Sequence, residues 1–210
     1  MIKRIVSVLY SDFHPWDTYW PEAETLTSSN PNNLQEGDIL IVHGGADISP
    51  SLYNKRVSRH TYANDRPSPR DVTEWDMMQH ASKMGIPIIG ICRGGQMLCA
   101  LAGGHLIQHV NNHAGWNHPV ITVDGTEFDT NTIHHQMMYP FDVTHELLAW
   151  SKETLSDVYY DEDTPVHVPV EPEYVYFPTV KGFAIQWHPE MMPASTKATQ
   201  YIINTINERL

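Results

Sequence analysis

The sequence predicts a single α/β domain with a largely parallel central sheet. Two observations lead to this prediction. In the first half, short apolar runs typical of buried parallel strands alternate with segments of helical character. After residue 104 the pattern becomes a succession of short apolar runs and turns, which predicts a small β-rich excursion. One abrupt strand-to-helix junction, at Cys92, indicates where the chemistry lies.

Length and charge limit the classes of protein to consider. We assign all 210 residues, 1–210, to one domain, because this length supports a sizeable core. There are 13 Lys and Arg residues against 25 Asp and Glu, a formal charge of −12. This balance argues against a nucleic-acid partner, which requires basic side chains against phosphate. No apolar stretch approaches membrane-spanning length, so no membrane partner is predicted.

The first 45 residues contain two apolar runs that we interpret as strands. Residues 5–9 follow two basic residues, but the run is short and lacks the cleavage site of a signal peptide, so a strand is preferred. Residues 14–21 are aromatic and contain two prolines, which predicts at most a short irregular helix. Residues 39–42 form the second strand, which ends at His43-Gly-Gly45.

A long loop and a helix are expected next. Residues 46–70 contain three prolines and several basic residues, a composition typical of a loop. Residues 71–84 predict a helix with Asp71 as its N-cap and Glu74 three residues later. Gly85 is expected to end this helix.

The remaining elements follow from shorter signals. Residues 86–91 predict a strand and residues 96–102 a helix. Near the C-terminus, residues 183–187 predict a last core strand and residues 196–210 a helix. Between these parts we expect short strands at 120–123, 128, 143, 147–150, 158–160 and 174–177.

The segment 161–173 is acidic and contains three prolines. It is longer than most connections between strands. We interpret it as a solvated surface loop, and the alternative is a lid or a surface for a partner.

The junction at Cys92 predicts a nucleophile elbow. A strand that turns at once into a helix holds the side chain at its corner above the sheet edge. Gly90 and Gly94 lie two residues on either side of Cys92, where a Cβ would clash as the chain reverses. At the N-terminus of a helix, the dipole and free N–H groups favour a thiolate.

The second cysteine, Cys99, is expected to pack in the core. It lies seven residues after Cys92, on the helix that follows the elbow, and helical geometry holds the two thiols too far apart for a disulfide. Two unpaired cysteines fit a reducing compartment, so we expect a cytoplasmic protein.

A thiolate nucleophile requires a base, and the base requires an acceptor that orients it. His188 directly follows the last apolar strand and is followed by Pro189 and Glu190. If that strand lies beside the elbow strand, His188 emerges at the same sheet edge as Cys92. The expected roles are therefore nucleophile for Cys92, general base and acid for His188, and orienting carboxylate for Glu190.

Acyl transfer also requires hydrogen-bond donors for the oxyanion. Gly44-Gly45 follows the strand at 39–42, which is expected to end at the same sheet edge. A backbone N–H in this pair, together with the N–H of Arg93, would form the oxyanion hole. The Arg93 side chain could bind a substrate carboxylate or form a salt bridge that braces the elbow.

These motifs resemble a known superfamily. Gly90-Ile-Cys-Arg-Gly-Gly-Gln96 and Trp187-His-Pro-Glu190, in this order and spacing, resemble the class I glutamine amidotransferases. Further segments resemble the γ-glutamyl-γ-aminobutyrate hydrolase branch, also called peptidase C26, and the resemblance runs from about residue 39 to 192. These segments are His43 to Tyr53, Arg70-Asp71 with Glu74, Gly103-Gly104 with Leu106 and Gln108, and Thr132-Ile-His-His-Gln136.

The resemblance implies a flavodoxin-like three-layer sandwich with a mostly parallel central sheet. It also implies a γ-glutamyl thioester on Cys92 that water resolves, with His188 and Glu190 completing the triad. Gly45 and Arg93 would supply the oxyanion N–H groups. The substrate contacts implied by the resemblance are Gly44, Gln96, Ile133, His134, His135 and Gln136.

No cofactor and no metal site is predicted. His134 and His135 have further histidines nearby in sequence, but these show neither a tight ligand spacing nor cysteine partners. We therefore expect these histidines to form a polar wall of the site. The nearby histidines considered are His105, His109, His113 and His118.

The expected substrate is a small γ-glutamyl compound, and two leaving groups stay open. A hydrolase would release an amine, whereas an amidotransferase subunit would pass ammonia from glutamine to a separate acceptor or synthetase subunit. A catalytically degenerate interaction module and a cysteine peptidase are the alternatives from other classes. A homodimer is compatible with the sequence, which does not determine the oligomeric state.

Overall fold

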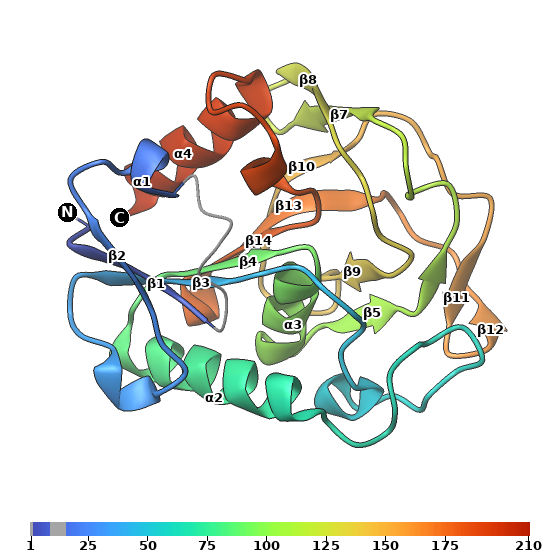
Figure 1. Cartoon of the computed structure of the whole chain (residues 1–210). Coiled ribbons are helices and arrows are strands. Elements are labelled where there is room, and N and C mark those ends of the chain that lie inside the picture. The colour runs from blue at the N-terminus through green and yellow to red at the C-terminus, as the bar shows by residue number, and fades with distance from the viewer. Residues whose placement is uncertain (1, 9–15) are drawn as a thin grey trace.

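The computed structural model describes residues 2–8 and 16–210. The predicted α/β architecture is confirmed: one nine-stranded sheet lies between two layers of helices (Figure 1). Its strand order is β2-β1-β3-β4-β14-β13-β10-β7-β8. In that order the strands are Glu24–Thr27, Arg4–Ser7, Asp38–Val42, Ile88–Ile91, Gly182–Ile185, Pro172–Phe177, Glu146–Ser151, His118–Thr122 and Glu127–Thr130.

The sheet has a parallel and an antiparallel half. Strands β2, β1, β3, β4 and β14 pair in parallel. From β14 onward, β13, β10, β7 and β8 pair antiparallel. Every residue of β3 and β4 is buried, which is why these strands have continuous apolar sequences. The expected β-rich excursion therefore continues the main sheet.

Helices cover both faces of the parallel half (Figure 1). Helices α2 (Pro69–Met84) and α3 (Arg93–Leu101) lie on one face, and α1 (Trp16–Tyr19) and α4 (Lys197–Arg209) lie on the other. Short 3-10 helices span Pro31–Asn33, Pro50–Tyr53, Pro178–Val180 and Pro189–Met191.

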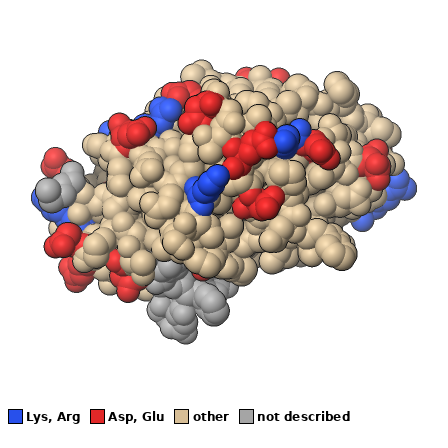
Figure 2. Space-filling model, turned by 90° about the horizontal axis from the view of Figure 1, so that it is seen from above, with Lys and Arg blue, Asp and Glu red and all other residues tan. Residues whose placement is uncertain are grey.

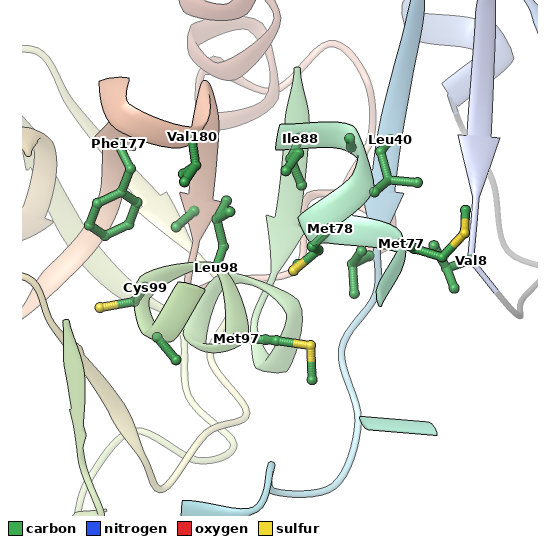
Figure 3. Packing of buried hydrophobic residues seen from close by; sticks show 14 of the residues in the cluster. Val8, Leu40, Met77, Met78, Ile88, Met97, Leu98, Cys99, Phe177 and Val180 are labelled. Atoms are coloured by element: carbon green, nitrogen blue, oxygen red, sulfur yellow. The ribbon is translucent and has the colours of Figure 1, made fainter. Parts of the chain in front are cut away.

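Alternate residues of each central strand enter different cores. Ile88 of β4 packs with Met78 and Leu98 under α2 and α3 (Figure 3). Its neighbour Ile89 joins the opposite cluster, which contains Trp16 of α1 and residues of α4. Each layer of helices is thus fixed to the sheet by its own apolar cluster.

Two small sheets flank the antiparallel half. One pairs β5 (His105–Ile107) with β9 (Met137–Tyr139), and the other contains β6 (His109–Val110), β11 (Tyr159–Asp161) and β12 (Thr164–Pro165). The sequence did not predict β5, β6 or β9, because two or three residues give no readable periodicity.

The segment 161–173 is less free than the predicted surface loop. Its acidic side chains pair with the basic loop at 46–70: Lys55 Nζ lies 2.7 Å from Asp161 Oδ2, and Arg56 Nη2 lies 2.8 Å from Glu162 Oε2. The segment also contains β12 and the start of β13.

The start of α2 differs from the sequence prediction. Ser68, not Asp71, is the N-cap: its Oγ accepts the Asp71 N–H at 3.1 Å, and the Asp71 carboxylate accepts the Ser68 N–H at 2.8 Å. Pro69 at the first helical position favours this start. Glu74 is therefore not part of the capping box.

Other predicted elements need correction. Val143 lies in a turn and not in a strand. Strand β2 was missed because its residues are mostly exposed and lack an apolar pattern. Within the predicted strand 5–9 and helix 14–21, Leu9 and residues 14–15 lie outside the described residues, and β1 and α1 cover the rest.

Charges are dispersed over the surface. On the face seen in Figure 2, basic side chains stand among acidic ones, and the described residues drawn there form no broad basic patch. Among the described residues, no helix combines the length and the apolar character needed to cross a membrane.

The first prediction concerns the packing of β4 against α3. A Cβ on Gly90 would overlap the backbone carbonyl of Gly94. We expect Gly90→Ala to lower the free energy of unfolding by roughly 3 kcal/mol, because the backbone at the elbow must shift. Gly115→Ala is the control: no atom lies within 4 Å of its Cβ, so only its φ of 93° contributes a cost of roughly 1 kcal/mol. Urea unfolding measures both, and equal losses would contradict the packing argument.

Candidate active site

Cys92 occupies the single residue between β4 and α3. Its φ of 50° and ψ of −110° are uncommon for a residue with a side chain, and the surrounding contacts must hold this strain. Its N–H donates to the carbonyl of Ile185 in β14 at 2.6 Å. The predicted elbow is therefore present, with Cys92 buried to 6% relative exposure at the N-terminus of α3.

His188 and Glu190 follow the strand next to the elbow strand. β14 pairs in parallel with β4, and Ile185 lies opposite Ile91, so the two chains leave the sheet at the same edge. His188 Nδ1 lies 2.6 Å from Glu190 Oε1. This contact leaves His188 Nε2 as the ring nitrogen available to the thiol.

Gly44 brings Cys92 and His188 into one site. A Cβ on Gly44 would lie 2.6 Å from His188 Cε1 and 3.5 Å from Cys92 Cβ. Both side chains therefore flank this glycine, which follows β3. Any side chain at position 44 would push the imidazole away from its place.

The surroundings of His188 favour its protonated form. Burial lowers the pKa of His188, but the hydrogen bonds and charges of Cys92 and Glu190 outweigh burial and raise it to about 10. At neutral pH this arrangement supports an imidazolium at His188, beside the sulfur of Cys92. Such a pair combines a nucleophile with a proton donor for the leaving group.

Asn131 is a positioning residue that sequence reasoning missed. Its Nδ2 donates to the His188 carbonyl at 2.9 Å, and its Oδ1 accepts the His188 N–H at 2.9 Å. The Tyr19 hydroxyl donates to the Pro189 carbonyl at 3.0 Å. No motif marked Asn131, because its partner is 57 residues away in the chain.

The glycine loop after β3 is held by Arg70. Its Nη2 donates to the carbonyl of Gly44 at 2.8 Å and to that of His43 at 3.2 Å. A Cβ on Gly45 would overlap the Arg70 guanidinium. As the first residue of α3, Arg93 has an N–H without an acceptor inside the helix, as an oxyanion donor requires.

The Arg93 side chain braces the elbow from within the protein. It forms ion pairs with Asp71 and Glu74 of α2, and all three side chains are buried. Arg70 Nε lies 2.8 Å from Glu74 Oε1, which extends this network to the glycine loop. Of the two roles that the sequence left open for Arg93, the structure shows the salt bridge.

The residues predicted to contact substrate are only partly brought together. Gln96 is buried, and its Nε2 donates to the Gln136 carbonyl at 3.0 Å, which joins α3 to the segment before β9. His135 Nε2 lies 2.9 Å from Asp47 Oδ1, whereas Ile133 is 56% exposed. His134 is directed into a buried cluster away from solvent.

Cys99 has the environment predicted for a core residue. It packs with Leu98 and Phe177 (Figure 3), and burial raises its pKa to about 12. Both cysteines are free, which confirms the prediction that they form no disulfide.

Comparison with known proteins identifies the family of this chain. The Peptidase C26 family model matches residues 24–190. NtpR of Enterococcus hirae is 26% identical over 189 residues, which cover 80% of this chain and 72% of NtpR. A Mycobacterium tuberculosis protein with a provisional glutamine amidotransferase name is 30% identical over 171 residues, which cover 72% of this chain and half of that protein.

Solved structures show the same fold. A glutamine amidotransferase from Thermotoga maritima superposes with a TM-score of 0.61 at 15% identity, covering 100% of this chain and 84% of that one. A chain of PurLQS from Thermotoga maritima gives a TM-score of 0.62 at 15% identity, covering 100% and 99%. These structures confirm the predicted α/β fold.

The second prediction tests the brace beneath the elbow. We expect Arg93→Met to lower the free energy of unfolding by about 3–5 kcal/mol, because two buried carboxylates lose their shared partner. Arg56→Met is the control, since the Arg56 side chain is 88% exposed and its loss should leave stability nearly unchanged. Chemical denaturation measures both, and a stable Arg93→Met variant would show that the pairs do not brace the elbow.

Proposed function

Because the chain belongs to the peptidase C26 family of class I glutamine amidotransferase-like proteins, we propose that it hydrolyses a γ-glutamyl amide bond through a thioester on Cys92. One observation carries this proposal. Cys92 at the elbow and the His188–Glu190 pair flank Gly44 from two adjacent strands. A buried structural thiol would need neither the strained backbone nor the paired imidazole.

The first half of the reaction forms the thioester. The Cys92 thiolate attacks the γ-carbonyl carbon, and the N–H groups of Gly45 and Arg93 donate hydrogen bonds to the developing oxyanion. When the tetrahedral intermediate collapses, the C–N bond breaks and the leaving amine takes a proton from His188. The products of this half are the free amine, a γ-glutamyl thioester and a neutral imidazole.

The second half returns the enzyme to its starting state. Neutral His188 accepts a proton from water while the water oxygen attacks the thioester carbonyl. The C–S bond breaks, Cys92 leaves as a thiolate, and glutamate is released with the water oxygen in its γ-carboxylate. Glu190 holds the imidazole through Nδ1 and stabilises its charged form in both halves.

Gln96, Gln136 and the segment at 133–135 are proposed to form the wall around the substrate's amino-acid end. This assignment is supported by the contact between Gln96 and the Gln136 carbonyl. The Tyr62 ring and the His135 ring lie 4.7 Å apart near Asp47, beside this segment. Since both cysteines are free thiols, we also propose a reducing, cytoplasmic location.

The alternative is a glutaminase subunit that passes ammonia to a separate enzyme. It is supported by the relatives, which include the carbamoyl phosphate synthase small chain of Ruegeria pomeroyi at 25% identity over 108 residues. Turnover of γ-glutamyl amines by the purified chain would favour hydrolysis. Glutaminase activity that appears only with a partner protein would favour transfer.

The third prediction identifies the nucleophile. A diazoketone analogue of glutamine should alkylate Cys92, because the imidazolium keeps this thiol reactive at neutral pH. Peptide mass spectrometry should find one adduct in the natural protein and none in Cys92→Ala. Cys99 is an internal control, since burial and its raised pKa should leave it unmodified. No adduct at Cys92, under conditions that label a known amidotransferase, would refute the proposal.

The fourth prediction concerns pH. Glu190 helps to raise the pKa of His188, so Glu190→Gln should lower that pKa. The imidazolium is then lost at lower pH, and the alkaline limb of the kcat/KM profile should move to lower pH. Glu162→Gln, which removes a half-buried carboxylate paired with Arg56, should leave the profile unchanged. If the alkaline limb of Glu190→Gln did not move, Glu190 would not be raising the pKa of His188.

A further inference from the structure

A second cluster of ionisable side chains lies apart from the triad. It brings together three histidines and two glutamates, all buried to 5% relative exposure or less. Charged and polar groups at this depth require partners, since burial without them is costly. The members are His113, His118, His134, Glu171 and Glu173.

The contacts between Glu173 and the three histidines are longer than ordinary hydrogen bonds. Glu173 Oε1 lies 3.4 Å from His118 Nε2, 3.8 Å from His134 Nε2 and 3.8 Å from His113 Nδ1. Ordinary hydrogen bonds measure about 2.7–3.2 Å. A tetrahedral ion with metal–nitrogen distances of about 2.0–2.1 Å holds neighbouring ligand atoms about 3.3–3.5 Å apart, close to the observed spacing.

The opposite ring nitrogen of His134 makes a hydrogen bond of ordinary length, and those of His118 and His113 lie near oxygen atoms at longer distances. His134 Nδ1 lies 2.9 Å from the Gln136 carbonyl, and His118 Nδ1 lies 3.4 Å from the Pro119 carbonyl. His113 Nε2 lies 3.3 Å from Glu171 Oε2. Metal-binding histidines place one nitrogen on the ion and donate the other N–H to a carbonyl or a carboxylate, and His134 shows this arrangement with the Gln136 carbonyl.

The two glutamates differ in a way that fits this arrangement. Glu171 accepts the N–H groups of Leu155 at 3.0 Å and Ser156 at 2.8 Å, and the Tyr159 hydroxyl at 2.6 Å. Among the described residues, none donates a hydrogen bond to either carboxylate oxygen of Glu173, whose shortest contact to a histidine nitrogen is 3.4 Å. Glu171 is thus already satisfied, whereas Glu173 lacks the partner that its burial requires.

We propose that His113, His118, His134 and Glu173 bind one Zn²⁺ ion. The ligand atoms of His113, His134 and Glu173 lie within 4.8 Å of one another, and His118 adds the shortest contact to Glu173. Imidazole nitrogens with one carboxylate suit zinc better than Mg²⁺ or Ca²⁺, which prefer oxygen ligands. The sequence prediction of no metal site considered spacing along the chain, where these ligands are far apart.

The ion would be structural. Four protein ligands close its coordination sphere and leave no position for a substrate. It would fix the segment that follows β8, where the His113 carbonyl accepts the His134 N–H and the Thr132 hydroxyl, each at 2.8 Å. Asn131, which holds the backbone of His188, directly precedes this segment.

The fifth prediction tests the ion directly. We would use untagged protein carrying Cys92→Ala, so that the triad thiol cannot bind metal. After chelator treatment and addition of Zn²⁺, elemental analysis should find one zinc per chain. Co²⁺ in its place should give the visible absorption bands of a four-coordinate site. Chelation should lower the Tm, and zinc, but not Mg²⁺, should restore it.

Variants locate the site. Adding Glu173→Gln or His118→Asn to Cys92→Ala should abolish stoichiometric zinc binding, whereas His167→Ala, which removes an exposed histidine, should not. If a cluster variant fails to fold, the metal content of Cys92→Ala and the effect of chelator on its Tm still test whether the protein binds zinc. Less than about a tenth of an equivalent of zinc, with a Tm that does not change on adding chelator, would overturn the proposal and leave a metal-free cluster of histidines and glutamates. Because the readout is metal content, this result is independent of the proposed hydrolysis.

Discussion

The reversal of the chain at Cys92 is the constraint on which the rest of the site depends. β4 becomes α3 within one residue, and this is possible only because Gly90 and Gly94 have no side chains. A Cβ on Gly90 would overlap the Gly94 carbonyl, and a Cβ on Gly94 would overlap the Val42 carbonyl of β3. The strain at Cys92 is therefore held by the packing of two strands and a helix, and the thiol has one place at the sheet edge.

The charges beneath the elbow complete this constraint. Arg93 forms ion pairs with Asp71 and Glu74 inside the protein, and these pairs hold α2 against the start of α3. Arg70 connects Glu74 to the Gly44 carbonyl, which places the loop beside His188. The Arg93 side chain, which the sequence could assign either to substrate or to structure, thus belongs to a network of ion pairs that joins the elbow to the glycine loop.

Prediction from the sequence succeeded where burial leaves a strong local pattern. β3 and β4 are buried on both faces and give continuous apolar runs, and the glycines around Cys92 reveal the elbow. β2 could not be predicted, because it lies at the sheet edge and is largely exposed. The N-cap of α2 was misplaced by three residues, since Ser68 and Asp71 both suit that position.

Contacts between residues that are far apart in the sequence could not be predicted from local sequence patterns. Asn131 was missed because only the fold brings it to the backbone of His188. The His113–Glu173 cluster was missed for the same reason, since its members lie on different strands and loops. The elbow was visible because all its requirements fall within a few consecutive residues.

The site lies where the two halves of the sheet meet, so Cys92 and His188 depend on different parts of the protein. β14 is parallel to β4 and antiparallel to β13, so it joins both halves of the sheet. Cys92 and the glycine loop belong to the parallel half. His188 follows β14, and its position depends on the antiparallel half, because the Glu173 carbonyl of β13 accepts the Gln186 N–H at 2.8 Å. The side chain of the same Glu173 enters the histidine cluster, so whatever satisfies that carboxylate also fixes the strand from which His188 emerges.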